Sequence, residues 1–191
     1  MPKTISVTSI SLILAVSLAF PALSQMAGHG HGMGMHHGAD GTGHDMVTMP
    51  GLRGLDASPE ESAELAEMFR NFQKIERGVT NLPNGIRTVT SSSDAAVMDI
   101  LVSHVAGMIA RVEEGRDPQV FVQSPTLDIF FARGNEITTE IEITEAGIVV
   151  TQTSDVPELV DALQVHAAEV SDMAARGMAA VHEMMMRRAG N

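Results

Sequence analysis

The chain has 191 residues, with 24 Asp and Glu against 12 Lys and Arg, and it contains no Cys, Trp or Tyr. The formal charge of −12 argues against nucleic acid or an anionic membrane surface as a partner, because both attract basic proteins. The absence of Cys excludes disulfides, thiolate metal sites, iron–sulfur clusters and covalently attached c-type haem. The informative residue types are therefore the eight His and fourteen Met.

Residues 1–24 have the organisation of a secretory signal peptide. Lys3 provides the positive start, residues 5–20 are apolar, and Ala22 and Ser24 place small side chains before a cleavage site near Ser24 and Gln25. The apolar run is short for a membrane span, so we expect no membrane insertion after cleavage. The mature protein is predicted to be periplasmic or secreted.

Residues 25–56 are predicted to form a disordered His/Met/Gly-rich segment and a linker. Val47 is its only aliphatic core former before residue 50, so the segment cannot bury enough apolar surface to offset its ordering entropy. Imidazole binds Cu, Zn and Ni, whereas thioether prefers Cu(I), so their interleaving points to copper more than to zinc or nickel. The candidate ligands are His29, His31, Met33, Met35, His36, His37, His44, Met46 and Met49.

This tract resembles the His/Met-rich tails of periplasmic copper-handling proteins, and the resemblance covers only the tract. Glycines between the ligands let several of them wrap one ion, but each binding event then costs ordering entropy. A labile buffering or loading site for Cu(I) or Cu(II) is therefore favoured over a deep structural site.

Residues 57–191 are predicted to form one α+β domain built from an internal duplication. Eight of the 31 residues from 85 to 115 are identical to the residue 62 positions later, and His104 and His166 are one such pair. Each copy has the alternation of a hairpin followed by the periodicity of a helix. The expected hairpin strands are 73–80 and 86–91 in the first copy, and 136–143 and 148–153 in the second.

Helices complete this predicted domain. Ser58, Pro59 and Glu61 have the pattern of a helix start, and the two copies end in helices over about 94–114 and from about 156 onwards. We expect the last helix to continue through Gly177. With an extra strand at 127–132, the domain becomes an antiparallel sheet of about five strands with two to three helices on one face.

The duplicated histidines form a second candidate site. His104 and His166 each follow a leucine of the apolar stripe by three residues, so each is placed at the edge of a buried helix face. They either bond to local structural partners or converge between the two helices, where Met108 would add a thioether one turn after His104. The candidate carboxylates that would support such a site are Asp99, Glu169 and Asp172.

No phosphate loop, dinucleotide fingerprint or HExxH motif is present, so we expect no enzyme. The leading prediction is a periplasmic metal-binding protein that buffers or chaperones copper and exchanges it with a copper donor or acceptor protein. The alternatives are an exported structural or adaptor domain that binds a protein partner, and a noncovalent haem binder with His104 and His166 as paired axial ligands.

Overall fold

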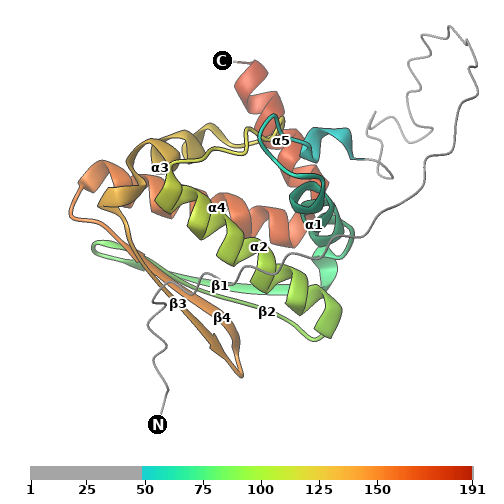
Figure 1. Cartoon of the computed structure of the whole chain (residues 1–191), viewed down its shortest axis with the longest axis horizontal. Helices are drawn as coiled ribbons and strands as arrows, with labels where there is room; N and C mark the ends of the chain where they lie inside the picture. The colour runs from blue at the N-terminus through green and yellow to red at the C-terminus, as the bar shows by residue number, and fades with distance from the viewer. Residues whose placement is uncertain (1–48, 191) are drawn as a thin grey trace, which may run out of the picture. The chain divides into compact units, whose positions relative to one another are not determined.

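The computed structural model describes residues 49–190, so the predicted signal peptide and almost all of the His/Met tract lie outside the described residues. Within this range the fold is α+β, with one four-stranded antiparallel sheet and helices packed on it (Figure 1). The sheet order is β1-β2-β4-β3, so the two hairpins join along β2 and β4. The strands are β1 (Ile75–Leu82), β2 (Gly85–Ser92), β3 (Thr138–Thr144) and β4 (Gly147–Thr153).

Two glycines allow the hairpins to approach each other. Gly85 opens β2 and Gly147 opens β4, with φ of 159° and 117°. A Cβ on Gly85 would lie 1.9 Å from the carbonyl oxygen of Gln152, and a Cβ on Gly147 would lie 2.3 Å from that of Thr90. Each glycine is therefore required where it meets the backbone of the other hairpin.

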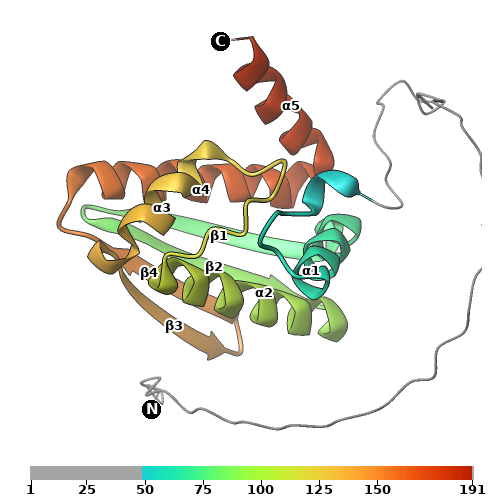
Figure 2. The same ribbon diagram turned by 45° about the horizontal axis from the view of Figure 1, so that its top comes forward.

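The long helices lie over the sheet, as both ribbon views show (Figures 1 and 2). α1 begins at a capping box in which Ser58 and Glu61 satisfy each other's backbone amides. α2 begins after Asp94, whose side chain accepts from two backbone amides. The α-helices are α1 (Pro59–Arg70), α2 (Ala95–Glu114), α3 (Asp128–Arg133), α4 (Pro157–Arg176) and α5 (Met178–Ala189), and the 3₁₀ helices are η1 (Pro50–Leu52), η2 (Phe72–Lys74), η3 (Pro125–Leu127) and η4 (Gly134–Glu136).

Each long helix packs on a strand of the other hairpin. Leu101 of α2 belongs to an apolar cluster with Ile148 of β4. Leu163 of α4 belongs to a second cluster with Ile86 of β2 and Phe130 of α3. α2 is also long and apolar enough to cross a membrane by length and composition, a test that core helices pass as well.

The predicted fifth strand at 127–132 is wrong, because this segment is helical. Ser124 accepts a hydrogen bond from the amide of Thr126 and starts η3, which continues into α3. Phe130 and Phe131 are consecutive and both buried, an arrangement that a strand with one buried face does not allow.

Two further boundaries differ from the sequence prediction. The predicted linker contains η1, and its Leu52 is 1% exposed in a cluster with Met49 and Phe69. The single last helix is divided at Gly177, whose φ of 59° and ψ of −138° end α4 before α5 begins. A side chain there would collide with the ring of Phe72, so the backbone turns where only glycine fits.

Candidate functional site

A cavity of about 330 Å³ lies between the sheet and the helices. It is lined by residues of strands β1, β2 and β4, of helices α1, α2, α4 and α5, and of the segment from Pro118 to Phe130. Figure 2 shows how these helices lie relative to the sheet. Most of the lining side chains are apolar. The volume lies within the range of roughly 300–1,000 Å³ that small-molecule sites occupy, and it far exceeds the space that one metal ion needs.

The two duplicated histidines line this same cavity. His104 and Met108 contribute to it from α2, and His166 contributes from α4. The two side chains therefore border one volume from two different helices. His166 is further fixed by the ring of Phe130, which meets it edge-on with centroids 5.6 Å apart.

The carboxylate of Glu169 lies beside the imidazole of His166. Nδ1 of this histidine is enclosed and lies 3.7 Å from Oε2 of Glu169. The other carboxylate oxygen of Glu169 accepts from the hydroxyls of Ser124 at 2.9 Å and Thr126 at 3.3 Å. Burial opposes the charge on Glu169, but His166 and these hydroxyls outweigh it and hold the pKa below its usual value.

His104 has a different environment. Burial lowers its pKa, and the carboxylates of Glu64 and Glu61 oppose that effect only in part. None of the described residues hydrogen-bonds to its ring. His104 is therefore a neutral imidazole, the form in which histidine binds a metal.

Of the remaining predicted ligands, the structure describes only Met49. His29, His31, Met33, Met35, His36, His37, His44 and Met46 lie outside the described residues. Met49 is 4% exposed and belongs to the apolar cluster of Leu52 and Phe69. Of the two other carboxylates considered, Asp172 pairs with Arg176 and Asp99 is exposed.

Arg77 is a cavity residue that the sequence prediction missed. It reaches the cavity from β1, and its Nη1 donates to Oγ1 of Thr90 at 2.7 Å. Its Nε is enclosed without a partner, and burial lowers the pKa of its guanidinium to about 10. The available signal was strand alternation, which places Arg77 on the same face of β1 as Ile75.

No family model, curated protein or solved structure matches the chain. The function is therefore argued from the cavity and the side chains that line it. These side chains form a mostly apolar lining that includes imidazoles from two helices, α2 and α4, and one cation from β1.

Proposed function

We propose that the folded domain of this exported protein binds haem noncovalently in the cavity, with His104 and His166 as the axial ligands. The observation that carries the proposal is that imidazoles from two separate helices line one apolar cavity. Porphyrin nitrogens already hold the iron of haem, so the protein adds only axial ligands. A bare ion in a closed structural site needs about four protein ligands, and within residues 49–190 no three His, Asp or Glu side chains come together for one.

The proposal relies on the internal duplication, which would place His104 and His166 at equivalent positions of two equivalent helices. Gly115 ends α2 and Gly177 ends α4, 62 positions apart; both have a positive φ, whereas their ψ values of 27° and −138° differ. The apolar clusters that join α2 to Ile148 of β4 and α4 to Ile86 of β2 support the same relationship, and α2 also contacts β2 of its own hairpin. A pseudo-twofold axis between the copies would bring His104 and His166 to the ligand from opposite sides.

The surrounding side chains suit this role. Glu169 beside Nδ1 of His166 is the type of carboxylate that orients a ligating imidazole and raises its basicity. The neutral state of His104 leaves a lone pair for ligation without loss of a proton. Bound haem would supply a redox-active iron in a mostly apolar cavity.

A titration of the purified mature protein with haemin tests the proposal. We expect saturable one-to-one binding with a sharpened Soret band and the spectrum of a six-coordinate low-spin iron. His104→Ala and His166→Ala should each convert it to a five-coordinate or weakly bound form. The matched control is His182→Ala, at an exposed position of α5, which should leave the spectrum unchanged. Absence of a Soret change, or equal spectra in all variants, would contradict haem binding.

Copper buffering by the His/Met tract is a separate proposal. It depends on the interleaved imidazoles and thioethers of residues 26–49, almost all of which lie outside the described residues. Copper analysis of the chain with and without this tract separates it from binding in the cavity.

A further inference from the structure

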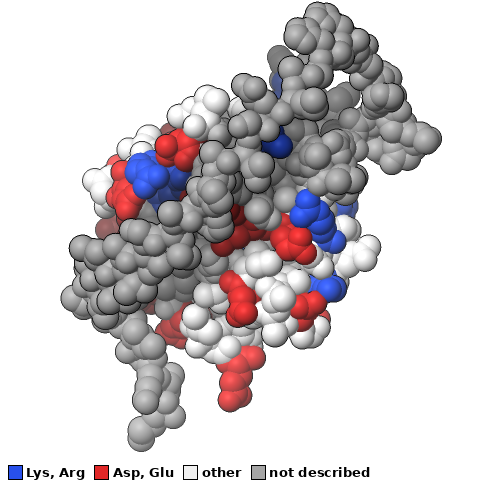
Figure 3. Space-filling model, turned by 45° about the vertical axis from the view of Figure 1, so that its right-hand side comes forward, with Lys and Arg blue, Asp and Glu red and all other residues white. Residues whose placement is uncertain are grey.

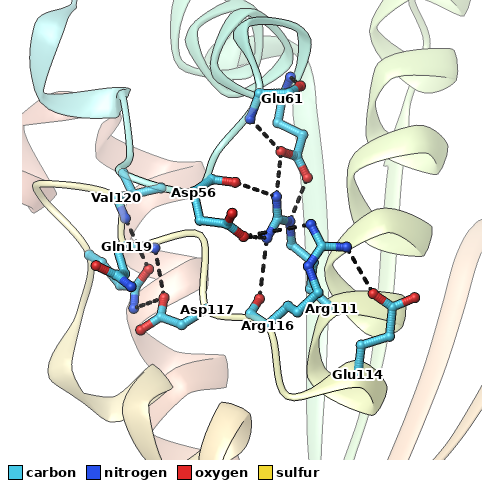
Figure 4. Close-up of polar contacts among 10 residues, drawn as sticks. Asp56, Glu61, Arg111, Glu114, Arg116, Asp117, Gln119 and Val120 are labelled. Atoms are coloured by element: carbon cyan, nitrogen blue, oxygen red, sulfur yellow. Dashed lines mark hydrogen bonds and ion pairs between the residues drawn. The ribbon is translucent and has the colours of Figure 1, made fainter.

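The chain contains two largely enclosed arginines with opposite surroundings. Arg111 of α2 is the first, and its side chain is 6% exposed. Its Nε and Nη2 donate to the two carboxylate oxygens of Glu61, and its Nη1 donates to Asp56 (Figure 4). Backbone carbonyls of Asp56 and Arg116 accept further bonds. This guanidinium therefore has charged partners that offset the cost of burying it.

Arg77 is the second, and it lacks such partners. Its one hydrogen bond goes to the neutral hydroxyl of Thr90, and its enclosed Nε has no acceptor. Its pKa of about 10 keeps the guanidinium charged at neutral pH. No ion pair joins Arg77 to a carboxylate of the described residues. Arg77 is half-buried and its Nε is fully enclosed, so a charge held there without a counter-charge is unfavourable and favours a partner from elsewhere.

The missing counter-charge is conspicuous because the chain is acidic. It carries twice as many acidic as basic residues, and on the face in Figure 3 basic side chains lie beside acidic ones at several points. Yet no Asp or Glu lines the cavity, where Arg77 is the one Lys or Arg among the described lining residues. An anion that enters the cavity would therefore find a single unpaired cation in otherwise apolar surroundings.

We propose that the ligand of this cavity carries a carboxylate that pairs with Arg77. The inference deepens the proposed function, on which it rests, because haem carries two propionates on an apolar ring. A fatty acid has the same chemistry, an apolar body with one acidic group. Arg77 is then a specificity-determining residue that selects acids over their neutral esters, since a guanidinium binds a carboxylate through two parallel hydrogen bonds.

The test compares acids with esters in the full mature chain. Haem and its dimethyl ester are titrated into wild type and Arg77→Met, a variant of similar length without charge. We expect wild type to prefer the acid and Arg77→Met to bind haem about tenfold to a hundredfold more weakly, with ester affinity unchanged. The control is Arg87→Met on β2, where the arginine is exposed.

The experiment distinguishes a failure of the haem proposal from a failure of the proposal that Arg77 pairs with a carboxylate. If wild type shows no Soret change, haem binding fails, and laurate against methyl laurate then decides the role of Arg77 by the same acid-to-ester comparison. An equal loss for acid and ester, or no acid preference in wild type, overturns the inference about Arg77. Unfolding in urea provides an independent readout, because Arg77→Met removes an uncompensated buried charge. Ligand-free Arg77→Met should unfold at a higher urea concentration than wild type. If Arg77 only stabilises the fold, the variant should instead unfold at a lower urea concentration.

Discussion

Nδ1 of His166 lies 3.7 Å from Oε2 of Glu169, one turn further along α4. The same carboxylate accepts hydroxyl hydrogen bonds from Ser124 and Thr126, which precede α3. Glu169 therefore connects the cavity wall formed by α4 to the segment that closes the cavity. An imidazole held on one side by a carboxylate and on another by Phe130 has few rotamers left, which is how a binding site is kept in position before the ligand arrives.

Glu169→Gln tests whether Glu169 positions His166. The amide keeps the shape but loses the charge, so we expect haem affinity to fall by about 10- to 100-fold and the low-spin spectrum to shift partly to high spin. Glu169→Asp should recover part of the spectrum. The control is Asp172→Asn, because Asp172 is on the same helix and pairs with Arg176 at the surface. If both amide variants bind haem equally, Glu169 has no positioning role.

His104 should make the stability of the ligand-free protein depend on pH. Burial lowers the pKa of folded His104, while Glu64 and Glu61 oppose this shift. The unfolded chain therefore takes up a proton first, and the free energy of unfolding should decrease as the pH falls below about 6.5. His104→Leu should flatten this slope in urea denaturation between pH 7 and pH 5, whereas His182→Leu should not. A slope that survives in His104→Leu would assign the effect to another group.

The fold was largely predictable because its signals are local. The turn at Asn84 and Gly85, the capping box of Ser58 and Glu61 and the alternation of β3 each depend on residues close in sequence. The segment at 127–132 was wrongly predicted as a strand because a short apolar run is compatible with a strand or with a buried helix.

The site was predictable only in part. The repeat and the helical spacing brought attention to His104 and His166, and Glu169 followed from its position one turn after His166. The cavity and the burial of Arg77 depend on how far α2 and α4 stand apart over the sheet, which arises from the whole set of tertiary contacts. No local pattern encodes an enclosed volume, so a sequence alone does not reveal it.

The ion pair of Glu61 with Arg111 should stabilise the protein above about pH 4.5. The Arg111 guanidinium outweighs the cost of burial and lowers the pKa of Glu61 to about 2. Because this pKa is depressed, its contribution is present above the unfolded value and is lost as the pH falls from about 4.5 to about 2. At pH 7, Glu61→Gln should lower the free energy of unfolding by about 2 kcal/mol, less than for a fully buried pair because the carboxylate is partly exposed.

Glutamine can keep the capping-box acceptor, but its NH2 group replaces one of the two oxygens that accept from Arg111, so the loss in Glu61→Gln reports on the charge and on one hydrogen bond. Glu60→Gln, at the exposed neighbouring position, should change stability by less than about 0.5 kcal/mol. The difference between the two variants should disappear near pH 2. A difference that persists there would mean that the hydrogen bonds, not the charge, stabilise this contact.

Two glycine-to-alanine substitutions should have opposite effects. Gly177→Ala forces a side chain into a backbone conformation with φ of 59° and ψ of −138° and into the ring of Phe72 at 2.8 Å. We expect it to lower the free energy of unfolding by about 2–4 kcal/mol. Gly107 lies within α2 with nothing within 4 Å of a new Cβ, so Gly107→Ala should stabilise by about 0.5–1 kcal/mol. Equal effects in urea denaturation would show that the break at Gly177 is not required.

The last prediction separates the His/Met tract from the residue at its end. The sequence predicts that residues 26–48 are disordered, and a disordered segment makes few native contacts. Deletion of these residues should therefore remove most of the copper capacity and change the Tm by no more than a few degrees. Met49→Ala should behave in the opposite way. Its side chain is 4% exposed among Leu52, Phe69 and Val181, so truncation should cost about 2–4 kcal/mol in unfolding free energy while the copper capacity remains. Copper titration and thermal unfolding of both variants provide the measurement. A large drop in Tm on deletion would show that the tract is packed. A loss of copper capacity in Met49→Ala would show that Met49 is a copper ligand.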